Sequence, residues 1–426
     1  MAAKARNEIL RIPFERAPLQ ALRLDRPWFL VMTILLAGVA WGAYNLIFQQ
    51  WAKGLQVTGL NVSIYWGLYI VNFVFLIGVS AGGIIVGALA YAFGIERFRP
   101  VARIAELMAI SCLILATLFI FVSIGAPDRF YFLFLYGQLG SPLIWDVLII
   151  LAYLALALVL GYFGTRADLV RCMDAMPERR WLYRILALGY TDLSPHALGR
   201  DRKILKALAI VSIPAAVLLH SITAWILGVV KARVTWHTSL LGPLFVVSAV
   251  VSGLALVILS AIVARALLGF RIGRETIVDL GKLLAFSIPI LGYFLFAELL
   301  TVTFGKEPAQ MHVFREMIWG HFAPVFWVNL IAGLLIPLLI LISPLRRTMT
   351  GVGIASALVV LGVFLERSNI VILPQLHRLL FPFYPHGSYT PTAVELSIVA
   401  GIYALGAVFF AFCAKLFPLV ELEERR

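Results

Sequence analysis

Long apolar stretches, separated by short polar segments, follow one another along the whole chain. Each holds roughly 20 residues, the length that an α-helix needs to cross the hydrocarbon of a bilayer. The stretch at 349–366 is the shortest of them. We therefore predict an all-α, polytopic membrane protein with ten spans at about 28–48, 66–93, 103–125, 143–165, 205–230, 239–265, 281–304, 321–343, 349–366 and 394–417.

The composition agrees with this pattern. Hydrophobic residues make up 62% of the 426 residues and charged residues only 13%, whereas a soluble domain is about half apolar and a quarter charged. This excludes an ordinary soluble enzyme and a disordered chain, and an outer-membrane barrel would alternate apolar with polar residues. Cys112, Cys172 and Cys413 lie far apart, so we expect no disulfide framework, metal site or iron–sulfur cluster in this chain.

Positive charge is distributed unevenly between the two sides that these spans define. If residues 1–27 lie in the cytoplasm, all but eight of the 35 lysines and arginines fall on the inner side, as the positive-inside rule requires. Arg367, which follows the span at 349–366, is counted among the outer residues. The net charge of +13 then needs no nucleic acid as partner. We expect both termini in the cytoplasm, with a basic segment 1–27, a transmembrane domain 28–417 and a tail 418–426.

Polar side chains within the predicted spans gather toward the outer face. Asn72 and Glu298 lie six residues inside their spans, about 9 Å deep, and His220 lies about 15 Å deep. Asp146 begins its span at the same side. Because polar groups in hydrocarbon are costly, each is a candidate for function. A single ligand site in the outer third of the membrane explains all four, whereas Glu106 and Glu395 are expected to be solvated at an interface.

A quinone headgroup would suit these side chains. His220 can donate to a carbonyl oxygen and titrates near neutral pH, while Asp146 and Glu298 can pass protons. Pro214 should kink the helix that carries His220. The simpler alternatives are that His220 and Asn72 only hydrogen-bond neighbouring helices, and that Asp146 caps its helix or pairs with Arg129.

Several segments resemble one known family. "WGLYIVNFVFLIGVSAGG" (66–83), "GSPLIWD" (140–146) and "HSITAWILGVVKARVTWHTSLLGPLFVVSAVVSGLAL" (220–256) are similar to the polysulfide reductase membrane-subunit family, called NrfD/PsrC-like. "ERSNIVI" (366–372) and "YTPTAVELSIVAGIYALGAVFFAFCAKLFPLVE" (389–421) resemble its ten-span branch, which includes membrane subunits of menaquinone reductase (Qrc), the Dsr and Hmc complexes and alternative complex III. The resemblance covers roughly residues 60 to 421.

The resemblance implies a quinone- or quinol-binding subunit of a respiratory oxidoreductase complex in a bacterial or archaeal cytoplasmic membrane. Such a subunit exchanges electrons between a periplasmic, ferredoxin-like iron–sulfur subunit and the menaquinone pool, with molybdopterin-type or multihaem cytochrome c subunits behind it. The chain would bind menaquinone or another quinone as substrate, carry no haem, contact membrane lipid and act only with its partners.

The resemblance also implies where the quinone binds. The family builds its pocket on the first and fourth core helices, near the periplasmic face. His220 falls at the fourth-helix position, and the Tyr69–Asn72 turn falls at the first-helix position. The expected quinone-binding residues are therefore Tyr69, Asn72, His220, Trp225 and His237, and the expected catalytic residues are His220, Asp146 and Glu298. The implied bundles are a core at about 66–230, a second at about 239–366, and a last helix at about 394–417.

Two other functions and one repeat remain open at this point. A transporter or ion channel is favoured only by the number of spans and the proline-kinked helices. A cytochrome b-type haem carrier would need two imidazoles at equal depth, and only His220 with His237 or His321 could supply them. Trp66, Phe75 and Gly83 recur 170 positions later as Trp236, Phe245 and Gly253, either by chance or as an internal repeat.

Overall fold

The computed structural model describes residues 26–268, 270, 272–376 and 389–420, and in these ranges every regular element is helical. Ten helices are long and apolar enough to cross a membrane, which confirms the predicted all-α, ten-span architecture. They are α3 (Arg26–Tyr44) continued by η1 (Asn45–Trp51), α4 (Leu68–Gly87), α5 (Arg99–Ser123), α7 (Pro142–Ala175), α9 (Pro195–Gly228), α10 (Leu241–Leu268), α11 (Arg274–Gly305), α13 (Ala323–Val328) continued by η7 (Asn329–Leu335) and α14 (Ile336–Ile342), α15 (Met349–Leu376) and α16 (Ala393–Leu416).

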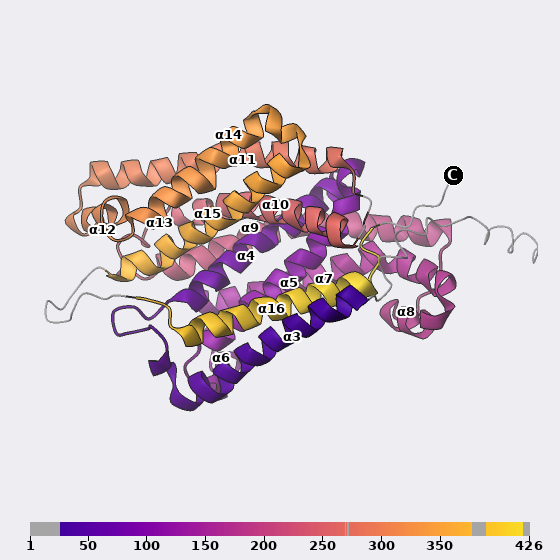
Figure 1. The fold of residues 1–426 in the computed structure, drawn as a ribbon, viewed down its shortest axis with the longest axis horizontal. Coiled ribbons are helices and arrows are strands. Elements are labelled where there is room, and N and C mark those ends of the chain that lie inside the picture. Colours follow the sequence, from indigo (N-terminus) through magenta and orange to yellow (C-terminus); the bar gives the residue numbers. More distant parts are fainter. Residues whose placement is uncertain (1–25, 269, 271, 377–388, 421–426) are drawn as a thin grey trace, which may run out of the picture.

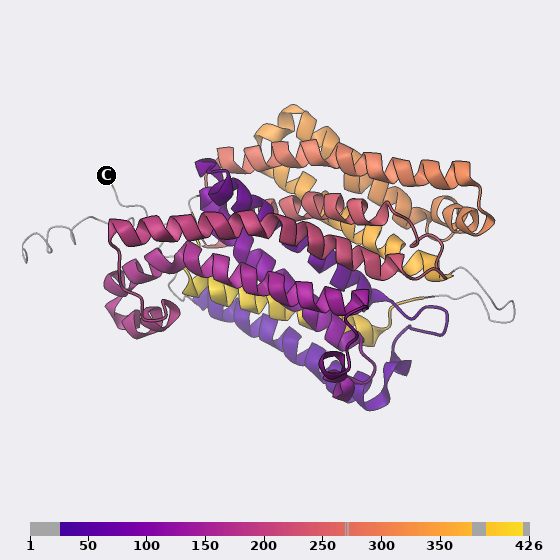
Figure 2. The same ribbon diagram turned by 180° about the vertical axis from the view of Figure 1, so that it is seen from behind.

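Eight of these spans form two bundles with the same order of helices (Figures 1 and 2). The first bundle is α4, α5, α7 and α9, and the second is α10, α11, α13–α14 and α15. In each, a short helix connects the second span to the third: α6 (Phe132–Leu135) in the first and α12 (Pro308–Ile318) in the second. The remaining two spans, α3 and α16, pack against each other beside the first bundle.

The two bundles meet along α4 and α10. Trp66 stacks on Trp236 with ring centroids 5.4 Å apart, and further along both helices Gly82 meets Gly253. A Cβ atom on Gly82 would lie 2.2 Å from the Gly253 carbonyl oxygen, so only glycine permits this approach. The residues just before the two helices pair with each other, and so do the two glycines further along. α4 and α10 therefore run in the same direction. The repeated tryptophans of the sequence thus face each other at the bundle interface.

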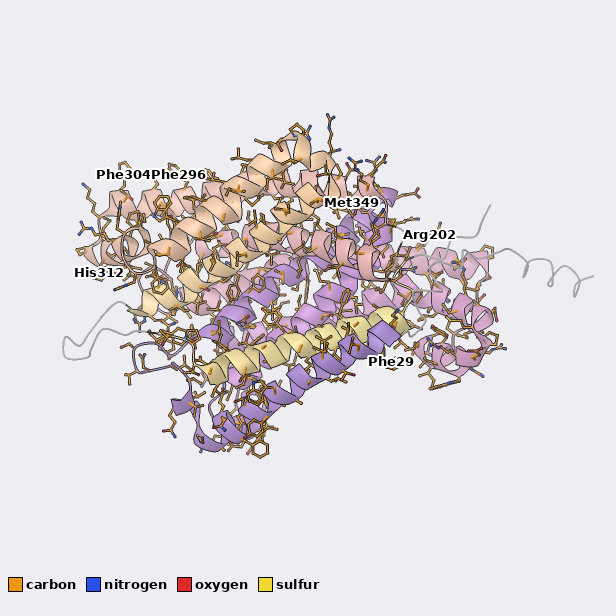
Figure 3. All side chains as sticks on the ribbon, in the orientation of Figure 1. Phe29, Arg202, Phe296, Phe304, His312 and Met349 are labelled. Carbon is orange, nitrogen blue, oxygen red and sulfur yellow. The ribbon has the colours of Figure 1, made fainter. Side chains whose placement is uncertain are left out.

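The molecule has two distinct ends (Figure 1). α6 and α12 lie at one end, which we call the α12 end, and α8 (Arg180–Leu186) lies at the other, the α8 end. Figure 3 shows His312 and Phe304 at the α12 end and Phe29, Arg202 and Met349 toward the α8 end. α7 and α9 have 34 residues each, about 51 Å. Since bilayer hydrocarbon is about 30 Å thick, they extend beyond it to carry α8.

The predicted end of the ninth span is wrong. α15 continues to Leu376, and Arg367, predicted to be in an outer loop, lies inside this helix with 1% of its surface exposed. Glu366, Asn369 and Gln375 are buried on the same helix. The apolar pattern stops early because these side chains face the protein interior, where polar groups can find partners, rather than the lipid.

Glu395 and Glu106 are also buried, contrary to the prediction that they are solvated. Glu395 lies at the start of α16, where it forms a capping box with Thr392. It also accepts hydrogen bonds from the Gly59 amide (2.8 Å) and the Tyr389 hydroxyl (2.8 Å). Donors from distant segments therefore replace water around this carboxylate.

Small residues let α3 and α16 approach closely. A Cβ atom on Gly42 would lie 2.7 Å from the Cα of Gly401, and one on Gly38 would lie 3.3 Å from the Cβ of Ala404. Glycine at i and i+4 on a membrane helix is the pattern that brings two backbones together. This contact holds the first of the ten spans against the last.

Candidate functional site

The first bundle contains a cavity of about 620 Å³ at the α12 end. Five segments form its wall: the first turns of α4, the end of α5, the segment around α6, the start of α7 and the end of α9. Aromatic and aliphatic side chains cover most of the wall. The lining residues are Trp66, Ile70, Phe73, Val74, Ile120, Ser123, Ile124, Ala126, Arg129, Phe130, Phe132, Leu133, Tyr136, Gly137, Leu143, Asp146, Val147, Thr223, Ile226 and Leu227.

Asp146 is the only carboxyl group among the described residues that line this cavity, and 2% of its surface is exposed. Thr223 Oγ1 lies 2.6 Å from Asp146 Oδ1 and 3.0 Å from the carbonyl oxygen of Leu219. A hydroxyl group has one proton and can also accept. Thr223 can therefore donate to ionised Asp146, or accept from protonated Asp146 while donating to Leu219. The carboxyl group keeps a partner in either charge state.

Arg129, the alternative partner that the sequence offered for Asp146, lies nearest to a different carboxylate. Arg129 is exposed at the rim of the cavity, and Arg129 Nε lies 3.9 Å from Asp128 Oδ2. Asp146 is on the second turn of α7, which begins at Pro142 after Ser141. Proline is tolerated at this first position because its missing amide proton would have no helical acceptor there. The start of α7 thus carries Asp146 into the cavity.

Two residues from distant segments fix the start of α4, and sequence reasoning missed both. Gln375 accepts from the backbone amides of Tyr65 (3.0 Å) and Trp66 (3.1 Å) and donates to the Trp66 carbonyl (2.7 Å). The Tyr389 hydroxyl accepts from the Leu68 amide (2.7 Å) and donates to Glu395. The bond from Leu68 satisfies an amide that the first helical turn leaves without a partner, and the bonds with Gln375 anchor the two residues just before the N-cap. They therefore hold Trp66 at the wall of the cavity.

The Tyr389 hydroxyl must keep its proton to donate to Glu395 while it accepts from Leu68. Burial, reinforced by the neighbouring Glu395 carboxylate, raises the pKa of Tyr389 above its ordinary value. The phenol stays protonated at any physiological pH, so it always has a proton to donate to Glu395.

His220 is buried between α9 and α4 and does not line the cavity. Its Nδ1 lies 2.6 Å from the carbonyl oxygen of Ala216, and its Nε2 lies 3.1 Å from the carbonyl oxygen of Ile77. A neutral imidazole has one N–H and can donate to only one of these oxygens, whereas the protonated ring can donate to both. His220 therefore joins two walls of the cavity, one helical turn from Thr223.

The remaining residues expected to bind quinone lie outside the lining of this cavity. The Tyr69 hydroxyl donates to Gln50 (2.6 Å), and Asn72 accepts from Tyr403 (2.7 Å) and donates to the Leu68 carbonyl (2.7 Å). Both side chains thus join α4 to the α3–α16 pair. Trp225 is 46% exposed. His237 is exposed and its Nδ1 faces the Gly228 carbonyl at 2.7 Å.

Glu298 lies in a different cavity, in the second bundle. Trp236 lines that cavity and Trp66 lines the first, so the stacked tryptophans stand between the two. The structure therefore divides the predicted polar cluster into two groups at the same end of the molecule.

The family described as "Polysulphide reductase, NrfD" matches residues 56–377, most of the chain. This chain belongs to the NrfD family. The family resemblance inferred from the sequence is confirmed, and NrfD membership together with the ten apolar helices makes the chain a multi-pass membrane protein.

Named relatives cover nearly the whole chain. A protein of Halobacterium salinarum, provisionally named as a membrane subunit of dimethyl sulfoxide reductase, is 32% identical over 93% of this chain and 92% of its own length. The Hdr-like menaquinol oxidoreductase integral membrane subunit of Archaeoglobus fulgidus is 27% identical, over 92% of this chain and 94% of its own. The menaquinone reductase integral membrane subunit of Nitratidesulfovibrio vulgaris is 23% identical, over 92% of each. None of these three names describes a transporter or a channel.

Proposed function

We propose that this chain is the quinone-binding membrane subunit of a respiratory oxidoreductase complex, and that the quinone headgroup binds in the cavity of the first bundle. The observation that carries the proposal is this largely apolar cavity of about 620 Å³ with one buried carboxyl group in its wall. Membership of the NrfD family and two relatives named for menaquinol or menaquinone chemistry support it.

The size and lining of the cavity suit a quinone. Small-molecule sites usually measure about 300–1,000 Å³ and are mainly apolar with a few placed polar groups. The aromatic wall around Trp66 and Phe130 can hold a flat ring, and Asp146 can face one of its carbonyl oxygens. Tyr136, 73% exposed, and Phe132 belong both to the lining and to the outer surface. We propose that the isoprenoid tail leaves past them toward the lipid.

Asp146 is the proposed proton-exchanging residue. A bound quinone supplies the redox chemistry, taking up two electrons and two protons on reduction and releasing them on oxidation. Protonated Asp146 can donate to a substrate oxygen, and the ionised group can take the proton back. Thr223 accommodates both forms of the carboxyl group without leaving a buried polar atom unpaired. Asp146 and Thr223 can therefore exchange protons with the substrate without a change in the backbone conformation.

His220 acts in this proposal as a positioning residue. Its contacts with Ala216 and Ile77 fix α9 against α4, one turn from Thr223. Tyr69 and Asn72 support the opposite face of α4 by their bonds to Gln50 and Tyr403.

The electron partner is proposed to dock at the α12 end, which we take to face the periplasm. Both cavities and the connecting helices α6 and α12 lie at this end, so an iron–sulfur subunit bound there would be nearest to the quinone. Molybdopterin-type or multihaem cytochrome c subunits would follow behind it. The loops at 124–141, 229–240 and 306–322 would form the docking floor. The outer loop predicted at 367–393 begins within α15, and its residues 377–388 lie outside the described residues.

Asp146→Asn tests the proposed site. Asparagine keeps the shape of the side chain but cannot exchange a proton, so the intact complex should bind a quinone analogue about 10- to 100-fold more weakly and turn over slowly. Asp174→Asn is the matched control, because Asp174 is exposed near the other end of the same helix. Equal binding and turnover in Asp146→Asn and wild type would show that the cavity is not the quinone site.

A further inference from the structure

The second bundle contains its own cavity at the α12 end, built from the corresponding parts. Its wall comes from the start of α10, the end of α11, helix α12, the start of α13–η7 and the last turns of α15. These match α4, α5, α6, α7 and α9 of the first bundle in order. Trp236 holds the place that Trp66 holds in the first cavity. The bundles therefore share a plan, but the second cavity measures only about 90 Å³.

The second cavity differs from the first in its polar groups. Glu298 from α11, Glu366 and Asn369 from α15, and Asn329 from η7 all line it. Glu366 is 3% exposed. Its Oε2 accepts a hydrogen bond from Ser248 (2.6 Å), while its Oε1 has no hydrogen-bond partner among the described residues. Oδ1 of Asn369, also buried, is likewise without a partner in the described part of the chain. Two buried oxygens thus remain unpaired in a cavity with two carboxyl groups.

The charges of the residues around the second cavity indicate which kind of ligand it can bind. Glu298 and Glu366 carry two negative charges when ionised. Arg367, next to Glu366 and fully buried with its guanidinium 4.2 Å from the ring centre of Phe245, carries one positive charge. The charged residues of α12, namely His312, Arg315 and Glu316, do not line the cavity. Glu366 and Arg367 are buried and Glu298 is partly exposed. When both carboxyl groups are ionised, these three residues are one positive charge short of neutrality, and charge held away from water is costly.

We propose that this cavity is a binding site for one monovalent cation, held by the oxygens of Glu298, Glu366 and Asn369. Carboxylate and amide oxygens are the ligands of hard cations. Arg367 disfavours a divalent ion, which would leave an excess of positive charge. The volume admits a few water molecules but is well below that of sites for organic ligands. The cation is therefore a hydrated proton or a sodium ion.

The α15 backbone helps to shape this site. Pro374 has no amide proton, so the carbonyl of Ile370 loses its helical donor. The indole of Trp236 donates to this carbonyl at 2.5 Å. The bond fixes Trp236 in the wall of the second cavity and against Trp66 of the first. An occupant of the second cavity would thus contact a ring that is stacked on the wall of the first.

The test uses the intact complex in lipid nanodiscs without added quinone, so its outcome is independent of the proposed quinone site. Infrared difference spectra against pH report a protonated buried carboxyl group, and equilibrium binding of radioactive sodium reports the alternative cation. Wild type should show a titrating carboxyl band or one sodium ion per chain. Asp146 and Glu106 are also buried carboxyl groups, so the signal of this cavity is the part of the band that is lost in Glu298→Gln or Glu366→Gln. Each of the two variants should lose that part of the band or bind sodium about tenfold or more weakly.

Glu307→Gln is the matched control, since Glu307 is exposed just before α12, and it should leave both signals unchanged. Glutamine at 366 retains an oxygen that can accept from Ser248, so assembly should survive and is checked by thermal melting. If that variant does not assemble, Glu298→Gln, at a partly exposed position, decides the test. Absence of both signals in wild type, or their persistence in either assembled cavity variant, overturns the proposal.

Discussion

Thr223 holds the carboxyl group of Asp146 with a single hydroxyl proton. Thr223→Val keeps the branched shape but removes this proton, leaving the buried carboxyl group without its donor. We expect turnover of the complex to fall about tenfold, in line with a lost hydrogen bond to a charged group. Thr223→Ser restores the hydroxyl and should recover most of the rate. Quinone-dependent rates of the two variants, measured across a pH series, check this. Equal rates for valine and serine would contradict it.

His220 provides a second test of single residues. His220→Phe removes both contacts with carbonyl oxygens and should lower thermal stability by about 1–3 kcal/mol and slow turnover. His220→Gln restores a donor that can reach a carbonyl oxygen but cannot be protonated. If the residue positions α9 against α4, glutamine recovers both melting temperature and turnover. Recovery of the melting temperature without turnover would instead assign His220 a proton-carrying role.

The sequence could predict Asp146 but not the residues that position the site. An acid at the start of an apolar span is visible in the sequence because its charge is costly in hydrocarbon. Gln375 acts on Trp66 from 309 positions away, and Tyr389 acts on Leu68 from a similar separation. Such bonds depend on which helix ends lie side by side. Hydrophobic patterning carries no information about that arrangement.

At the scale of elements, the close approach of α4 and α10 positions both cavities. Gly82→Ala would place a Cβ atom 2.2 Å from the Gly253 carbonyl oxygen, so the helices must separate. We expect a loss of about 2–3 kcal/mol, comparable to an overpacked core. Gly292→Ala is the control, because no atom lies within 4 Å of its added Cβ, and it should be neutral or slightly stabilising. Thermal unfolding of both variants in detergent checks this, and equal melting temperatures would contradict it.

The ten spans were predictable because lipid requires long apolar segments wherever a helix faces it. The end of α15 was not, because its last turns face other helices. The sequence placed Glu366 at the last position of the span and Asn369 and Gln375 in a loop, yet all three are helical and buried. The buried carboxyl group of Glu395 was misjudged for the same reason. Inside a membrane protein, hydrogen-bonding groups of other helices can take the place of water around a polar side chain. A hydropathy pattern does not distinguish a polar residue that faces water from one that faces other helices.

At the scale of the whole molecule, the distribution of positive charge predicts the orientation in the membrane. Arg202 lies on α9 toward the α8 end and His312 lies on α12 at the opposite end (Figure 3). A membrane-impermeant maleimide applied to intact cells that lack the docking partner subunit should label His312→Cys but not Arg202→Cys, which should react only after the membrane is opened. The native cysteines are buried and give little background. Labelling of Arg202→Cys in intact cells would reverse the topology.

The glycine contact between α3 and α16 has a consequence for biosynthesis. α3 leaves the ribosome first among the ten spans, and its groove at Gly38 and Gly42 must face lipid until α16 follows. The remaining spans can pack meanwhile, since α3 lies outside both bundles. A polypeptide halted before α16 would therefore carry a nearly complete core with an open helical seam at its edge.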